Sequence, residues 1–160
     1  MKINLIALGT KMPEWIESGY HTYAKRIRSP WQLTLTELNI PKRHKHADIA
    51  ALKAQEGQAL LQASKNSTIR IALDEHGKQH TTQSMANTLS TLSQNHSYID
   101  VLIGGPDGLS SEILDASQLH WSLSSLTFPH HLVRIIMAEQ LYRAISLINN
   151  HPYHRGTDKN

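Results

Sequence analysis

The stretch SYIDVLIGGPDGLS, residues 97–110, carries the strongest indication of the fold. An apolar run ends at Ile103 and is followed at once by two glycines, a proline, an aspartate and a third glycine. Ser110 and Glu112 then open a short predicted helix. Ligands of open α/β sheets bind beyond the carboxyl ends of the strands, and glycine lets bare backbone approach them closely. The loop is therefore a candidate ligand wall, while an ordinary strand-to-helix turn stays open as the alternative.

Strand and helix patterns alternate along the whole chain. Apolar runs predict five strands, at residues 2–10, 33–40, 68–74, 97–105 and within 119–127. Apolar residues recurring every three and four positions predict helices at 12–28, 48–63, 110–117 and 131–149, and one that begins at Thr81 or Thr82 and carries Met85, Leu89 and Leu92. This order predicts a single α/β domain over residues 1–160, with a mostly parallel sheet covered by helices on both faces.

Two of these predictions are specific enough to be checked residue by residue. The second helix is expected to bury one face, made of Ile49, Leu52, Ala59, Leu60 and Ala63. The EHGK sequence at residues 75–78 is expected to form a turn after the third strand.

The last predicted helix is apolar around nearly its whole circumference. The residues concerned are Leu132, Val133, Ile135, Ile136, Met137, Leu141, Ala144, Ile145, Leu147 and Ile148. A surface helix of a small monomer would expose many of them to water, so a second subunit is expected to cover part of the helix. Deep burial within the same chain is the alternative.

Composition limits the compartment and the chemistry. The 160 residues contain no cysteine, which excludes disulfides, thiol catalysis and thiolate metal sites. The sequence shows no long apolar run and no signal-peptide pattern, so we expect no membrane contact and a soluble, cytoplasmic protein. Sixteen Lys and Arg against thirteen Asp and Glu leave a net charge of +3, which permits a nucleic-acid partner without requiring one.

Several familiar sites are disfavoured. The turn after the first strand reads LGTKMP instead of GxGxxG, and GGPDGLSSE supplies no lysine for a phosphate-binding loop, so neither NAD nor ATP is favoured. No GxSxG elbow of a serine hydrolase occurs. We expect no metal site, because carboxylates at metal-site spacing do not accompany the histidine pairs His44 with His46, His130 with His131, and His151 with His154.

The stretches LIGGPDGLS (102–110), WSLSSLTFPHHLVRIIMAEQLYRA (121–144) and NHPYHR (150–155), with NLIALGTKMPEW (4–15) at the start, together resemble the bacterial RlmH family. That family methylates N3 of a pseudouridine in 23S ribosomal RNA of the large subunit. The resemblance spans essentially the whole chain and implies the SPOUT fold, a parallel α/β sheet whose C-terminal part forms a trefoil knot. It also implies S-adenosylmethionine bound at the knot and a homodimer formed through the last helix. Because protein chains are generally unknotted, the knot is implied by the resemblance alone.

The resemblance also implies which residues form the site. The S-adenosylmethionine pocket would include Leu73, Gly104, Leu123, Ser124, Ser125, Leu126, Thr127 and Phe128. Leu73 and Leu126 alone would otherwise be interpreted as ordinary core. An imide nitrogen is protonated at neutral pH, so a base or a local positive charge is needed, and His154 and Arg155 in the closing HPYHR are the candidates. A solvated terminus is the alternative interpretation of that tail.

Ribosomal RNA is the partner that the resemblance implies. The candidate phosphate contacts are Lys11, Lys25, Arg26, the KRHKH connection at 42–46, Arg134, Arg143 and Arg155. With a net charge of only +3, we expect the intact ribosome, engaged by both subunits, to be the substrate in place of naked RNA. Two rivals remain: a noncatalytic RNA-binding or ribosome-associated dimer that has lost the cofactor, and a methyltransferase for another RNA. The intact LIGGPDGLS and LSSLTF stretches favour the enzyme over the noncatalytic rival.

Overall fold

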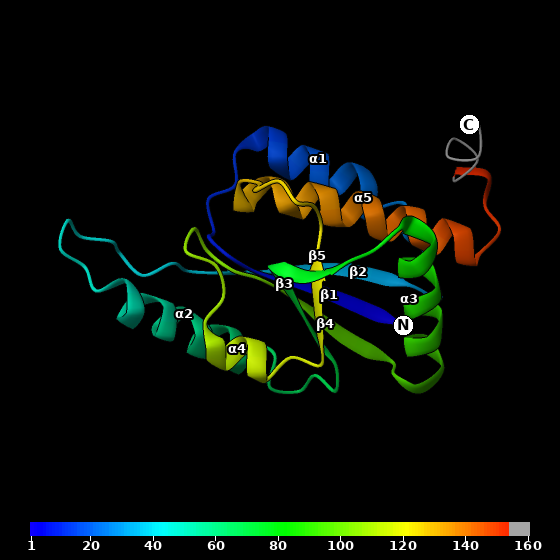
Figure 1. Cartoon of the computed structure of the whole chain (residues 1–160). Helices are drawn as coiled ribbons and strands as arrows, with labels where there is room; N and C mark the ends of the chain where they lie inside the picture. The colour runs from blue at the N-terminus through cyan, green and yellow to red at the C-terminus, as the bar shows by residue number, and fades with distance from the viewer. Residues whose placement is uncertain (154–160) are drawn as a thin grey trace.

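The structure, a computed structural model, describes residues 1–153, in which five strands alternate with five helices (Figure 1). The strands are β1 (Lys2–Leu8), β2 (Gln32–Leu38), β3 (Arg70–Gln79), β4 (Tyr98–Ile103) and β5 (Leu119–Ser122). The helices are α1 (Glu14–Ala24), α2 (Ile49–Ala63), α3 (Thr82–Asn95), α4 (Ser111–Asp115) and α5 (His130–Ile148). The predicted order of elements is confirmed over this range.

All five strands form one parallel sheet in the order β2-β1-β4-β3-β5. In the centre, Leu5 of β1 is opposite both Leu35 of β2 and Val101 of β4. Because every strand runs in the same direction, the carboxyl ends of β3, β4 and β5 meet at one edge of the sheet. The prediction of a mostly parallel sheet is confirmed.

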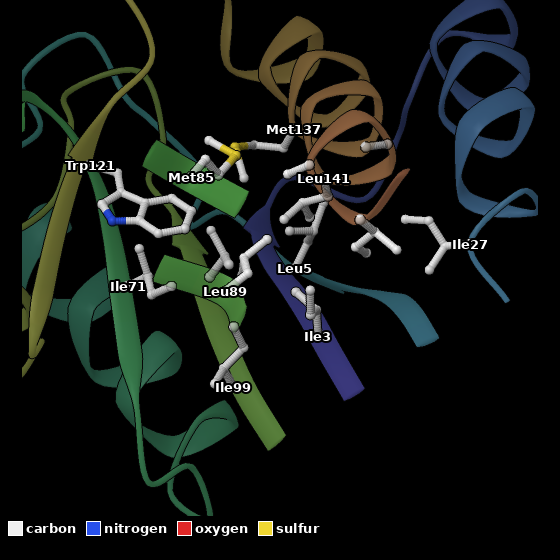
Figure 2. Close-up of a cluster of buried hydrophobic side chains, with 14 of the residues drawn as sticks. Ile3, Leu5, Ile27, Ile71, Met85, Leu89, Ile99, Trp121, Met137 and Leu141 are labelled. Carbon is white, nitrogen blue, oxygen red and sulfur yellow. The ribbon is translucent and has the colours of Figure 1, made fainter. Parts of the chain in front are cut away.

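Helices cover both faces of the sheet, as predicted (Figure 1). On one face, α1, α3 and α5 enclose the larger core, in which Met85, Leu89, Met137 and Leu141 surround the β1 side chains, with Trp121 at its margin (Figure 2). On the other face, α2 and α4 pack on Ile6, Leu8, Ala72 and Leu102. Alternate residues of β1 thus enter different cores, which is why this strand is apolar along nearly its whole length.

Side-chain caps begin three of the helices. Asp48 accepts hydrogen bonds from the backbone nitrogens of Ala50 and Ala51 at the start of α2. Thr81 caps α3 through Ser84 N, and the Ser110 hydroxyl oxygen accepts from Ile113 N of α4. These caps satisfy backbone donors that have no partner within the helix.

The face that α2 buries differs in part from the predicted one. Leu60 is buried as predicted, but Ile49 is 55% exposed, Ala63 is also exposed, and Glu56 and Gly57 are buried instead. Apolar spacing misplaced the buried face because a buried carboxylate and a glycine occupy the side that approaches the glycine loop.

The predicted turn at EHGK is wrong, because β3 continues through it to Gln79. A register shift between Leu73 and Lys78 allows the strand to resume its pairing with Trp121 and Ser122 of β5. At Gly77, an added Cβ would lie only 2.7 Å from the Trp121 carbonyl carbon, so the two backbones approach too closely for any side chain.

Helix α5 is partly covered by its own chain, since it packs against both α1 and α3. Met137, Ala138, Leu141 and Ala144 are fully buried. The homodimer and the trefoil knot remain predictions. None of the helices within residues 1–153 combines the length and apolar character that crossing a membrane would require.

Candidate functional site

A pocket of about 670 Å³ lies where β3, β4 and β5 end. Three segments form its walls: the end of the regular pairing of β3, the loop after β4, and the chain between β5 and the first turn of α5. The lining residues are Leu73, Asp74, Glu75, Ile103, Gly104, Gly105, Pro106, Asp107, Gly108, Trp121, Ser122, Leu123, Ser124, Leu126, Thr127, Phe128, Pro129, His130 and Val133. Its position agrees with the general location of ligands in parallel α/β sheets.

The glycine loop forms one wall with little side-chain bulk. The Gly108 nitrogen donates to the Gly105 carbonyl over 3.0 Å, which closes the loop into a tight turn, and Gly108 has a φ of +75°. A Cβ on Gly104 would lie 3.0 Å from the Gly108 carbonyl carbon and 3.1 Å from Leu109 Cδ2. Only glycine fits at position 104 without displacing its neighbours, and the positive φ favours glycine at position 108.

A carboxylate of α2 supports this loop from behind. Glu56 is only 2% exposed, and its Oε2 would lie 3.1 Å from a Cβ on Gly105. Arg43 donates to Glu56 Oε1 over 3.3 Å and also to Asp107 Oδ2 of the loop. Burial raises the pKa of Glu56, although the charge of Arg43 partly opposes the effect. The arginine thus connects the basic segment at 42–46 to the pocket wall.

The opposite wall bends sharply away from the sheet after β5. The Ser122 hydroxyl donates to the Ser124 carbonyl over 3.1 Å, and the Ser124 hydroxyl oxygen accepts from Leu126 N over 2.9 Å. These two local bonds turn the backbone at a small, polar place, and they leave Leu126 73% exposed.

The structure brings most of the predicted cofactor residues together. Seven of the eight line the pocket, from three separate segments: Leu73, Gly104, Leu123, Ser124, Leu126, Thr127 and Phe128. Ser125 is not among the lining residues, and its exposed hydroxyl accepts a hydrogen bond from Gln79 Nε2 over 2.9 Å. His154 and Arg155 lie outside the described residues.

Sequence reasoning missed the charged part of the lining. Asp74 and Glu75 follow Leu73 directly, and Asp107 and His130 belong to stretches already noted for other reasons. Asp74 and Glu75 stand at the end of the predicted third strand and Asp107 stands just after β4, and this position was the signal that could have identified them. His130 carried no such local signal. Within residues 1–153, no cluster of three or more His, Asp or Glu side chains is arranged to hold a metal ion.

Arg134 is not available to RNA, contrary to the prediction. It is fully buried, forms a 2.6 Å ion pair with Glu37 and donates to the carbonyls of Leu8 and Gly9 over 2.8 and 2.7 Å. Arg143 is also engaged, with Glu139 one helical turn earlier. The remaining described candidates, Lys11, Lys25, Arg26 and the 42–46 connection, are exposed.

The walls suit a flat, partly cationic ligand. The volume falls within the roughly 300–1,000 Å³ typical of small-molecule sites. Bare loop backbone and two local turns offer polar groups beside apolar side chains, and three carboxylates of the lining favour positive charge. S-adenosylmethionine, with an adenine ring, a sulfonium and an ammonium group, fits this set.

Fold and pocket together define a ligand-binding α/β protein whose site lies at the carboxyl ends of its strands. The model of one family, described as predicted SPOUT methyltransferase, matches residues 1–154. This chain belongs to the SPOUT methyltransferase family and uses S-adenosylmethionine as its methyl donor.

Relatives agree over nearly the whole chain. "Ribosomal RNA large subunit methyltransferase H" of Legionella pneumophila (strain Paris) is 46% identical over 155 residues, covering 97% of this chain and 99% of the relative. The protein of the same name from Pseudomonas entomophila (strain L48) is 42% identical, covering 97% and 100%.

Two solved structures share the fold at low identity. The structure of a probable methylase family protein from Haemophilus influenzae Rd KW20 has a TM-score of 0.57 at 16% identity, over 99% of this chain and 70% of that one. A probable methyltransferase from Bordetella pertussis Tohama I has a TM-score of 0.57 at 14% identity, over 89% of this chain and 95% of that one.

Proposed function

We propose that this chain, acting as a single SPOUT methyltransferase domain, transfers a methyl group from S-adenosylmethionine to N3 of a pseudouridine in 23S ribosomal RNA. The observation that carries the proposal is the 46% identity to a large-subunit ribosomal RNA methyltransferase over 97% of this chain. The pocket supports it, because seven residues implied for cofactor binding line one cavity.

The bound cofactor would supply an electrophilic methyl group on a sulfonium. The chain therefore has to align an acceptor nitrogen with that methyl and exclude water. Gly104 and the turn at Ser122 to Leu126 would place main-chain groups around the adenine. Leu73 and Leu126 would enclose the two faces of the adenine ring, so the exposed Leu126 would gain an apolar contact when the cofactor binds.

The acidic part of the lining would face the cationic part of the cofactor. Asp74, Glu75 and Asp107 lie in the same pocket as the leucines. Carboxylates attract the positive sulfonium of S-adenosylmethionine, whereas the sulfur of the product is a neutral thioether. The pocket would therefore favour the methyl donor over the product. This preference would assist exchange of product for fresh cofactor.

A homodimer through α5 is part of the proposal. Leu132 and Ile136, one turn apart on α5, are half-buried and do not belong to either core, and Trp15 on the neighbouring α1 is 63% exposed. Together they provide an apolar surface that a second copy would cover. The helices α1 and α5 lie side by side (Figure 1).

The assembled ribosome in the cytoplasm is the proposed substrate. Lys42, His44, Lys45 and His46 are exposed in the segment that Arg43 holds beside the pocket wall, so they are placed to contact phosphates near the site. One subunit with a net charge of +3 offers a modest electrostatic footprint, which a dimer on a folded RNA surface would extend. His154 and Arg155 of the tail are proposed to act near the acceptor base.

The test is transfer of labelled methyl groups to intact ribosomes and to free large-subunit RNA, compared side by side. We expect incorporation into ribosomes and little into free RNA. Calorimetry with S-adenosylmethionine distinguishes the enzyme from a noncatalytic RNA-binding or ribosome-associated dimer, because the latter would not bind the cofactor. Equal labelling of free RNA would contradict the proposed substrate but leave the enzyme class intact.

A further inference from the structure

One nitrogen base lies in the wall of the pocket. Of the titratable groups in the lining, three are carboxylates and one is the imidazole of His130. The carboxylates all have partners: Asp74 accepts from His76 N over 3.1 Å, Glu75 lies 3.7 Å from the His76 ring, and Asp107 pairs with Arg43. His130 is therefore the lining group whose chemistry the fold has not otherwise used.

His130 is held at the pocket by the start of α5. It is the first residue of the helix, follows the N-cap Pro129 and is half-buried. Its ring packs edge-on against His131 with 4.2 Å between the centroids. Within residues 1–153, no side chain or backbone group forms a hydrogen bond to either ring nitrogen of His130, so the imidazole keeps its capacity to accept a proton.

We propose that His130 is the general base that accepts the N3 proton of the acceptor pseudouridine, an inference that rests on the function proposed above. The N3–H bond breaks and the proton passes to the unprotonated imidazole nitrogen. The electron pair of N3 forms the new bond to the methyl carbon, while the carbon–sulfur bond breaks and its electrons remain on sulfur. Charge balances, since the sulfonium becomes a neutral thioether and the imidazole becomes an imidazolium.

The surroundings keep this imidazole neutral and ready to accept a proton. Burial, His131, Arg134 and Arg43 all lower the pKa of His130. The amino end of α5 acts in the same direction, because the helix dipole disfavours positive charge there. Three carboxylates, Asp74, Glu75 and Asp107, line the same pocket. A base that is neutral near pH 7 meets the requirement for general base catalysis at that pH.

The kinetic test compares His130→Gln with His96→Gln on ribosomes under single-turnover conditions. The second variant is a matched control, because His96 lies at the C-terminal end of α3 and does not line the pocket. We expect His130→Gln to lower the rate at least about 100-fold, the usual lower range for general base catalysis, and His96→Gln to change it less than about threefold. Calorimetry should show S-adenosylmethionine binding to both variants within about threefold of wild type.

Two further readouts separate proton transfer from a merely structural role. The wild-type rate should rise with pH through an ionisation below the ordinary histidine value of 6.5, and that ionisation should be missing in His130→Gln. Added imidazole should partly restore His130→Ala, because the small base can occupy the vacated space. Histidine-labelled protein followed by NMR gives the pKa of His130 without any turnover, and it should lie below 6.5.

Three results would overturn the assignment. The first is a His130→Gln rate within fivefold of wild type. The second is a rise of the rate with pH that disappears in His154→Gln but persists in His130→Gln. The third is a His130 that titrates above 7 in the NMR experiment. If His130→Gln does not fold, His130→Asn and the NMR titration of the wild type decide. Wild-type protein that labels no ribosome would refute the proposed function and this inference with it, whereas active wild type and active His130→Gln refute the inference alone.

Discussion

Gly104 has no room for a side chain, because a Cβ there would lie 3.0 Å from the Gly108 carbonyl carbon. We predict that Gly104→Val weakens S-adenosylmethionine binding at least about tenfold, because the valine side chain either fills the pocket or pushes the loop into it. Gly104→Ala should have a smaller effect. Calorimetry measures both, and unchanged affinity in the valine variant would show that the cofactor does not use this wall.

Glu56 connects residue chemistry to the stability of the loop. Burial raises its pKa in the folded protein above the ordinary value of 4.5, so the native state binds the proton more tightly than the unfolded state. Its contribution to stability is therefore present below pH 4.5 and is lost as pH rises through the folded pKa. Accordingly, the stability of wild type minus that of Glu56→Gln should fall as pH increases from about 4.5.

Chemical denaturation of both proteins across that pH range measures the difference in stability. The variant lacks the Arg43 ion pair at every pH, so this loss does not affect the slope of the difference against pH. A difference that rises with pH would mean that the ion pair with Arg43 outweighs burial.

At the scale of elements, Arg134 attaches α5 to the carboxyl ends of β1 and β2 through Glu37 and the Leu8 and Gly9 carbonyls. We predict that Arg134→Met lowers the free energy of unfolding by about 3 kcal/mol, because it leaves a carboxylate and two carbonyls without their donor. Denaturant titration at fixed protein concentration tests this. The exposed Arg28 supplies a control, since Arg28→Met should change stability by less than about 0.5 kcal/mol.

The burial of Arg134 also shows that local sequence patterns do not reveal partners far away in the chain. Strands, the α3 cap and the glycine loop were predictable because each depends on a few neighbouring residues, as with Thr81 and Ser84. A charge pattern records that an arginine is cationic, but the Glu37 that buries it is 97 positions away. Arg134 was therefore wrongly assigned to the surface.

Long-range approach explains the other errors in the elements. The EHGK sequence has turn residues, yet Gly77 is required because the backbone of β5 passes within van der Waals contact of β3. Similarly, Glu56 is buried in α2 because Arg43 and the glycine loop surround it. The prediction that Leu73, Gly104 and the segment 123–128 share one site came from family resemblance, since no local pattern brings three distant segments together.

At the scale of the whole molecule, the apolar surface of α5 tests the proposed dimer. Light scattering of the wild type should give twice the 18.0 kDa of one chain. Ile136→Asp should shift the protein to a monomer, because a carboxylate would be buried without a partner in a symmetric interface. Gln62→Asp on the exposed side of α2 is the control and should remain dimeric. A dimeric Ile136→Asp would place the interface elsewhere.

The pocket at the strand ends is proposed to direct a methyl group to N3 of one pseudouridine. Ribosomes from cells that lack this protein should be incubated with it and labelled S-adenosylmethionine, and the RNA digested for mass spectrometry. We predict a single new methyl group, on N3 of a pseudouridine in the large-subunit RNA. Label on any other nucleotide, or no label with folded protein that binds the cofactor, would contradict it.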